Sequence, residues 1–309
     1  MKTLRQRIRR GKGESDEDCK HKENDSEDYI SSRAGGKNLG SYLRFHLSCF
    51  FFYYAMPFLA TAGVALLIYE AFLVLSKDNM VIRYDVRGYG RSSELNGTYS
   101  DAKDLKIILD NLELKKAILI GVSNGGRIAL DFAVEYPELV HALVLMDSGV
   151  SGYRPANTEE EHIWDQYQSH ETKHNQLIKE GNFRGAAAID VDLWTNQVPN
   201  KVREKLLDIA TENARKSANY ESGLQKYPVP PAFDRLGSLK MPVLILIGSK
   251  DLPGSVLQGK RIHTMIGGSD LKIIEGADHI PSLSRPDEFS NEVQNFLVRL
   301  KFSDNKSVK

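Results

Sequence analysis

The feature that most constrains this chain is the segment 118–126, ILIGVSNGG, in which a serine lies between an apolar run and a helix-forming run. The first residues predict a buried strand and those after Ser123 predict a helix. A serine at such a junction sits on a strained turn and needs small residues two positions before and after it, which Gly121 and Gly125 provide. The turn would expose the Ser123 hydroxyl at the carboxyl edge of a sheet.

The rest of the chain alternates short β-branched runs with helical patterns, which is typical of a parallel sheet covered by helices. We expect strands at 80–85, 115–121, 141–147, 241–248 and 271–276, and helices at 101–112, 124–136, 256–265 and 287–300. Between 149 and 233 the strand pattern lapses into charged, helix-forming sequence that is too long for a loop. The sequence therefore predicts an α/β fold, a mostly parallel central sheet flanked by helices, with a helical lid over about 150–232.

Two candidate partners of Ser123 follow later predicted strands, namely Asp251 and His279. A serine hydroxyl is a poor nucleophile at neutral pH, so it needs a base within hydrogen-bond reach and a carboxylate that orients the base. We therefore predict Ser123 as the nucleophile, His279 as the base and Asp251 as the acid. The N–H of Asn124, at the start of the helix, is the expected first donor to an oxyanion.

Together these motifs resemble the α/β-hydrolase superfamily, in particular its lid-bearing serine esterases and C–C-bond hydrolases. The chain order Ser, Asp, His is that of the superfamily's triad, and YDVRGYGRSS at 84–93 is similar to its Asp-x-Arg-Gly-x-Gly turn. The resemblance covers about 80–300. It implies hydrolysis of a small ester or related acyl substrate without a metal or other cofactor, and it leaves esterase, thioesterase, C–C hydrolase and acyltransferase as alternatives.

The resemblance leaves two further points open. Some members take the acid from the strand end that Asp147 occupies here, so Asp147 is the alternative to Asp251. The superfamily also carries a His-Gly pair about 30 residues before the Asp-x-Arg-Gly turn, where this chain reads YYAMPFLA, so a backbone N–H within 55–58 is the candidate second oxyanion donor. The missing pair favours a second hypothesis, a non-catalytic or slow-turnover protein that uses the lid to bind or sense a ligand.

Other conspicuous side chains are given structural roles. The segment from His170 to His174 reads HETKH and matches the H-E-x-x-H zinc pattern, but its polar flanks and Lys173 argue against a metal site. Asp278, beside the predicted base, is expected to be a solvated loop carboxylate. Trp194 is expected to lie in the core of the lid more than in a substrate pocket.

The N-terminal part has an unusual order of charge. Residues 1–46 begin with six basic residues in twelve and continue into an acidic stretch, which predicts a disordered charged tail. Residues 47–69 carry no charge and are long enough to span a bilayer. They form either a membrane anchor or a buried strand at 49–54 and a buried helix at 61–75. We favour the second alternative, with a hydrolase domain over 47–309.

The composition gives no sign of a macromolecular partner. The chain has 41 basic and 41 acidic residues, so no overall field would attract nucleic acid. Two cysteines, Cys19 and Cys49, are too few and too differently placed for a disulfide framework. We expect a cytoplasmic protein with a small-molecule substrate, with membrane association through 47–69 as the alternative.

Overall fold

The computed structural model describes residues 33–34, 37–38, 50–54, 81–90, 92–220 and 223–306. Within them, a six-stranded sheet has the order β4-β3-β5-β6-β7-β8, and each neighbouring pair is parallel. The strands are β3 (Phe50–Tyr54), β4 (Val81–Tyr84), β5 (Ala117–Val122), β6 (Val140–Met146), β7 (Val243–Gly248) and β8 (Asp270–Ile274). A separate antiparallel pair joins β1 (Arg33–Ala34) and β2 (Lys37–Asn38). The predicted parallel sheet is confirmed.

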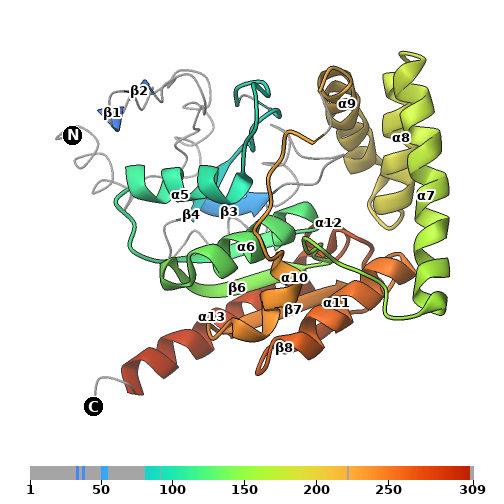
Figure 1. The fold of residues 1–309 in the computed structure, drawn as a ribbon. Coiled ribbons are helices and arrows are strands. Elements are labelled where there is room, and N and C mark those ends of the chain that lie inside the picture. Colours follow the sequence, from blue (N-terminus) through green and yellow to red (C-terminus); the bar gives the residue numbers. More distant parts are fainter. Residues whose placement is uncertain are drawn as a thin grey trace, which may run out of the picture.

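Helices connect the strands and also form an insertion between β6 and β7. The connecting and terminal helices are α5 (Asp101–Asn111), α6 (Asn124–Glu135), α10 (Ala232–Arg235), α11 (Pro253–Met265), α12 (Pro281–Ser284) and α13 (Pro286–Lys306). The insertion holds α7 (Thr158–Lys179), α8 (Phe183–Trp194) and α9 (Asn200–Ser217), which Figure 1 shows as one group on one side of the sheet. Asn157 and Asn182 cap α7 and α8 with side chains that accept a backbone N–H.

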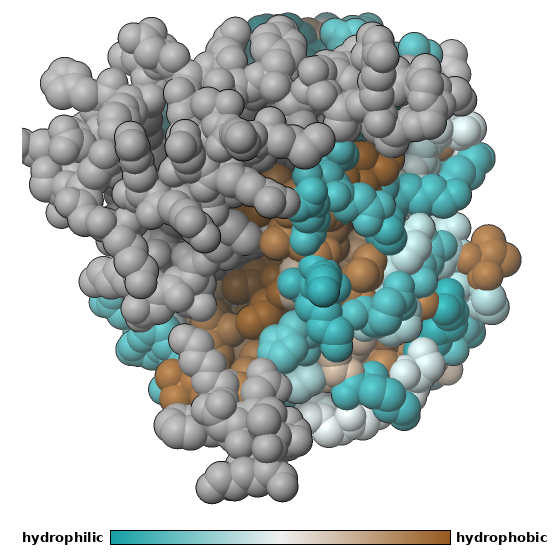
Figure 2. All heavy atoms as spheres, turned by 90° about the vertical axis from the view of Figure 1, so that its left-hand side faces the viewer, coloured by the Kyte–Doolittle hydropathy of each residue, from teal (hydrophilic) through white to brown (hydrophobic). Residues whose placement is uncertain are grey.

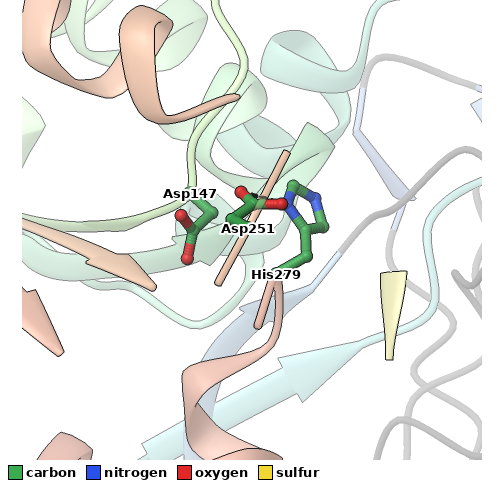
Figure 3. A group of neighbouring side chains, drawn as sticks. All are labelled: Asp147, Asp251 and His279. Atoms are coloured by element: carbon green, nitrogen blue, oxygen red, sulfur yellow. Dashed lines mark hydrogen bonds and ion pairs between the residues drawn. The ribbon is translucent and has the colours of Figure 1, made fainter. Parts of the chain in front are cut away.

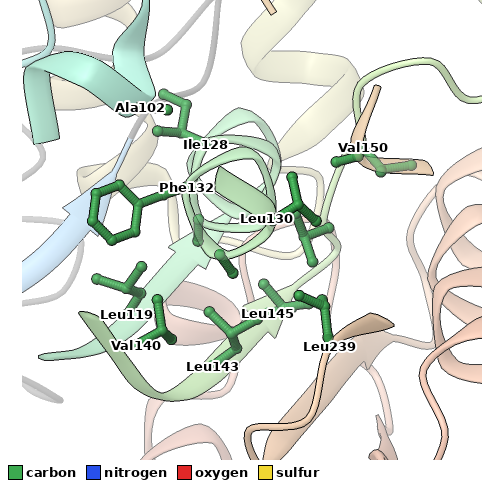
Figure 4. Packing of buried hydrophobic residues seen from close by; sticks show 14 of the residues in the cluster. Ala102, Leu119, Ile128, Leu130, Phe132, Val140, Leu143, Leu145, Val150 and Leu239 are labelled. Atoms are coloured by element: carbon green, nitrogen blue, oxygen red, sulfur yellow. The ribbon is translucent and has the colours of Figure 1, made fainter. Parts of the chain in front are cut away.

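Alternating residues of the central strands build two apolar layers, because successive side chains of a strand point to opposite faces. One layer packs β-strand residues such as Leu143 and Ile245 against α5, α6 and α11, and Figure 4 shows part of it around α6. The other packs Val144 and Leu246 against α13 and against α8 and α9 of the insertion. The insertion therefore shares a hydrophobic core with the sheet.

The strand β3 decides part of the question raised by the apolar segment 47–69. It lies between β4 and β5, with Phe50 opposite Val81 and Tyr53 opposite Gly121. Residues 50–54 are thus part of the sheet, as the second alternative expects. Apart from 33–34 and 37–38, the predicted tail at 1–46 lies outside the described residues, as do the expected helix at 61–75 and the remainder of 47–69. Among those that are described, no helix combines the length and the apolar character needed to cross a membrane.

Apolar side chains of the described part also reach one side of the molecule. Figure 2 shows the side that lies at the left of Figure 1, where hydrophobic residues occupy a recess and hydrophilic residues lie beside it.

Candidate active site

Ser123 lies on the turn that joins β5 to α6. Its backbone has φ +50° and ψ −117°, a positive φ that non-glycine residues rarely adopt and that costs about 1–3 kcal/mol. A Cβ on Gly121 would overlap the backbone of Gly125 and Gly126. The strain and the crowding that the G-x-S-x-G pattern predicts are both present, and they fix the serine at the carboxyl edge of β5.

Main-chain hydrogen bonds hold this turn against the end of β6. The N–H of Ser123 donates to the carbonyl of Met146 over 2.9 Å, and its carbonyl accepts the N–H of Gly149 over 2.9 Å. Helix α6 begins at Asn124, so the N–H of Asn124 is one of the four that have no acceptor inside the helix. It lies at the positive end of the helix dipole, directly after the serine.

His279 and Asp251 meet at the same edge of the sheet. His279 follows β8, Asp251 follows β7, and 2.7 Å separates Nδ1 of His279 from Oδ2 of Asp251. Both side chains are almost fully buried, with 3% and 1% of their surface exposed. Asp251 also accepts the N–H of Leu252 over 2.7 Å. The carboxylate therefore fixes the imidazole so that its other nitrogen, Nε2, is available for chemistry.

The Nε2 atom of His279 is buried and makes no hydrogen bond with the residues that the structure describes. Trp194, the last residue of α8, packs against the same imidazole with ring centroids 4.2 Å apart. No hydrogen bond joins Ser123 to this nitrogen, which is common in proteins without bound substrate because such bonds tighten when substrate binds. The expected assignment of Trp194 to the apolar core holds, and the same side chain also covers the base.

Asp147, the alternative acid, lies on the side of Asp251 that is away from His279 (Figure 3). Its two oxygens accept the N–H of Gly248 over 3.1 and 3.2 Å, whereas the ion pair of His279 is with Asp251. Burial raises the pKa of Asp147 well above its ordinary value, and the charge of Asp251 and a hydrogen bond with it raise the pKa further. Of the two candidate acids, Asp251 is the one that contacts the base.

The same three side chains also form a group that could be considered for a metal. Asp147, Asp251 and His279 each offer one ligand atom within 4.8 Å of the others, the only such group in the described part of the chain. Nδ1 of His279 is already hydrogen-bonded to Asp251, and burial raises the pKa of the Asp147 carboxyl, which favours its neutral form. This pattern fits a hydrogen-bonded acid–base set better than a cation site, because metal ligands must be deprotonated.

Comparison with known proteins identifies the family to which the chain belongs. The sequence model of the α/β-hydrolase fold family matches residues 74–286, more than half of the chain. The chain belongs to the α/β-hydrolase fold family. The predicted fold and family are thereby confirmed.

Relatives of this α/β-hydrolase include proteins of several activities. A putative 2-succinyl-6-hydroxy-2,4-cyclohexadiene-1-carboxylate synthase of Bacillus subtilis is 28% identical over 72% of this chain and 82% of its own. A 2-hydroxy-6-oxononadienedioate/2-hydroxy-6-oxononatrienedioate hydrolase of Escherichia coli is 29% identical over 71% and 76%. Among solved structures, an esterase from Thermogutta terrifontis has a TM-score of 0.66 at 20% identity, covering 88% of this chain and 97% of that chain. MenH from S. aureus has a TM-score of 0.65 at 22% identity, covering 84% and 99%.

Asp278 of this α/β-hydrolase corrects one expectation. It is only 1% exposed and not a solvated loop residue. Its carboxyl accepts the N–H of Gln197, from the insertion, over 2.8 Å and the N–H of Ile280 over 3.1 Å. Burial raises its pKa, against the lowering effect of these hydrogen bonds. Asp278 therefore ties the helical insertion to the loop that carries His279.

A second buried network, absent from the sequence predictions, begins one turn after the nucleophile candidate. Arg127 donates to Asp101 over 2.6 Å and to Asp131 over 2.7 Å, and its Nε donates to the side chain of Asn124. Burial alone would lower the pKa of Arg127, but the two carboxylates outweigh it and raise the pKa. An arginine inside the apolar helical run RIALDFAV was the signal in the sequence, because a buried cation requires buried anions.

Two other sequence predictions concern the second oxyanion donor and the HETKH motif. Residues 55–58, the candidate source of the second oxyanion donor, lie outside the described residues. In the HETKH motif, Nε2 of His170 pairs with one oxygen of Asp190 over 2.8 Å, and Nε2 of His174 pairs with the other oxygen over 3.3 Å. The carboxylate of α8 thus lies between the two imidazoles of α7 and links the two helices.

Proposed function

We propose that this α/β-hydrolase is a serine hydrolase that cleaves a small ester or related acyl substrate through an acyl-enzyme on Ser123. The observation that carries the proposal is the 2.7 Å hydrogen bond between His279 and Asp251, at the sheet edge where the strained serine turn lies. A carboxylate-oriented histidine and a half-buried serine at a helix N-terminus, on the same edge of the sheet, are the groups that acyl transfer requires. Membership of the family supports the same chemistry.

In the proposed reaction, the Oγ of Ser123 attacks the substrate carbonyl and its proton passes to Nε2 of His279. Asp251 stabilises the resulting imidazolium through Nδ1, and the N–H of Asn124 donates to the carbonyl oxygen as negative charge develops there. His279 then gives the proton to the leaving group, which leaves the acyl group on Ser123. A water molecule repeats these steps and releases the acid.

The surroundings of the base favour an apolar acyl group. Trp194 covers His279, and Leu252 and Leu283 pack against the same apolar layer. The resemblance to C–C-bond hydrolases, together with the relative named as a 2-hydroxy-6-oxononadienedioate/2-hydroxy-6-oxononatrienedioate hydrolase, keeps carbon–carbon cleavage as a variant of the same site. It would use the same serine, base and oxyanion donor. Short p-nitrophenyl esters and a vinylogous diketone would separate the two reactions.

The test is covalent labelling with a fluorophosphonate, followed by intact mass. We expect wild type to gain one adduct and Ser123→Ala to gain none, with ester turnover reduced by about 10⁴-fold or more. Ser282→Ala is the matched control, because Ser282 is buried three residues after His279 and its hydroxyl makes no hydrogen bond with described residues. Equal labelling of wild type and Ser123→Ala would refute the proposal.

One observation favours the second hypothesis, a ligand-binding protein with slow turnover. Trp194, from the insertion, packs on the buried base, so a ligand held by the insertion would lie against His279. If wild type is labelled once, but hydrolyses no ester faster than about one turnover per hour, well below ordinary enzymes, binding is the function. Rapid turnover would exclude it.

A further inference from the structure

Asp147 occupies a junction of the proposed active site. It follows β6 directly and has a positive φ of 39°, a strained conformation that aspartate tolerates better than most residues. The residue before it, Met146, accepts the N–H of Ser123, and the second residue after it, Gly149, donates to the carbonyl of Ser123. The Asp147 side chain, in turn, accepts the N–H of Gly248 at the end of β7. One short segment therefore touches both the nucleophile strand and the acid strand.

The charged groups that influence the buried carboxyl of Asp147 are other carboxyl groups. It is 2% exposed, and within the described residues it forms no ion pair with a lysine or arginine. The groups that act on its charge are Asp251, from the loop after β7, and Asp278, from the loop after β8. His279, which can carry positive charge, lies in the same group of side chains. Two adjoining carboxylates cannot both stay ionised in such a site, so one of them keeps a proton.

The hydrogen bonds decide which carboxyl keeps the proton. Asp251 accepts from both His279 and the N–H of Leu252, and both donors favour its charged form. Among the described residues, Asp147 has a single donor, the N–H of Gly248. The raised pKa of Asp147 agrees with this assignment.

We propose that Asp147 is a positioning residue whose neutral carboxyl donates a hydrogen bond to Asp251 and so holds the acid of the triad against β6. This inference rests on the proposed function. In this arrangement the O–H of Asp147 donates to Asp251 and its carbonyl oxygen accepts from Gly248. Asp147 thereby connects the end of β6, which holds the Ser123 turn, to the end of β7, which carries Asp251. It also limits the basicity that Asp251 confers on His279, because a donor to a carboxylate draws charge away from it.

Two substitutions of Asp147 distinguish a neutral carboxyl that donates a hydrogen bond from an ionised one. Asparagine reproduces the neutral acid, since its amide can donate to Asp251 and accept from Gly248. Leucine has a similar shape and no donor. For each variant, the rate of fluorophosphonate labelling is measured against pH, and the acidic limb of the profile reports the protonation of His279.

We expect Asp147→Asn to keep the acidic limb within about 0.3 pH units of wild type, because no charge is removed. We expect Asp147→Leu to label about tenfold more slowly or worse, the effect of losing one hydrogen bond to a charged group, with its acidic limb moved to higher pH. A limb that moves down by about one unit or more in Asp147→Asn would mean that a negative charge was lost and would overturn the proposal. Wild-type behaviour of Asp147→Leu would overturn it as well.

A second readout is independent of catalysis and of whether the leucine variant folds. In protein labelled with ¹³C-aspartate, the infrared spectrum of wild type minus Asp147→Asn at neutral pH should contain the C=O band of a protonated carboxyl group. A carboxylate band in that difference spectrum would refute the proposal. If Ser123→Ala labels like wild type, the proposed function fails, yet the infrared band still decides the protonation of Asp147.

Discussion

Two buried carboxylate clusters are connected to the serine turn, and they differ in what balances their negative charge. In the arginine cluster, the permanent cation of Arg127 lies between Asp101 and Asp131. In the base cluster, Asp147 and Asp251 lie side by side, and among the described residues neither forms an ion pair with a lysine or arginine. The first is neutralised by a fixed charge, and the second by a proton.

The difference follows from what each cluster has to do. Arginine stays protonated at all physiological pH values, so the arginine cluster holds α5 and α6 together under every condition in which the protein works. A shared proton leaves the base cluster responsive to the charge of His279, which would change during the proposed acyl transfer. A fixed cation beside Asp251 would weaken its interaction with the imidazolium. The arginine cluster, which holds two helices together, thus has a permanent positive counter-charge, whereas the base cluster at the proposed catalytic site is balanced by a proton.

Removal of the fixed cation should have the largest effect on the fold. In Arg127→Met, Asp101 and Asp131 would remain buried without their partner, which costs about 3–5 kcal/mol. The free energy of unfolding, measured by urea denaturation, should fall by that amount. Arg215→Met is the matched control, because Arg215 is 60% exposed in its pair with Glu212 and exposed pairs contribute about 0–1 kcal/mol. Equal losses in the two variants would show that the arginine cluster is not a clamp.

Asp278 extends the comparison, because main-chain N–H groups take the place of a cation there. Asp278→Ala would leave the N–H groups of Gln197 and Ile280 without their acceptor, at a cost of about 1–3 kcal/mol of unfolding free energy. Since Gln197 belongs to the insertion, hydrogen exchange should also increase around 195–199. Asp270→Ala, at an exposed carboxylate, should change neither quantity. Unchanged exchange in Asp278→Ala would mean that Asp278 does not tie the insertion down.

The sequence predicts the elements of the fold well, because their signals are local. The period-2 and period-3.6 patterns locate β5, β6, β7, α6 and α11 within a few residues. The serine turn is equally predictable, since crowding at Gly121 and the positive φ of Ser123 follow from the pattern itself. Chain order then leads to Asp251 and His279 as strand-end residues.

Interactions between distant segments are what the sequence does not predict. Asp278 reads as a solvated residue because nothing next to it indicates that Gln197, 81 positions earlier, will cover it. The choice between Asp147 and Asp251 depends on how far each carboxyl reaches from adjacent strand ends, so the sequence favours Asp251 but leaves Asp147 as an alternative. Such contacts are set by packing between β7, β8 and the insertion, which no local pattern encodes.

A pH-dependent effect, which is small over any single pH unit, distinguishes the two kinds of counter-charge directly. The ordinary pKa of an aspartate is 3.8, and that of Asp147 is raised in the folded protein. Above about pH 4 the unfolded chain releases this proton and the folded chain keeps it, so folding becomes less favourable as the pH rises, until the folded pKa is passed. Asparagine cannot titrate and removes this cost. The stability of Asp147→Asn relative to wild type should therefore increase with pH, by at most about 1.4 kcal/mol per pH unit.

Urea denaturation between about pH 5 and 8 measures this slope, with the exposed Asp110→Asn as control. A slope of zero would mean that Asp147 is ionised in the folded state, and that the base cluster is balanced by some charge other than a proton.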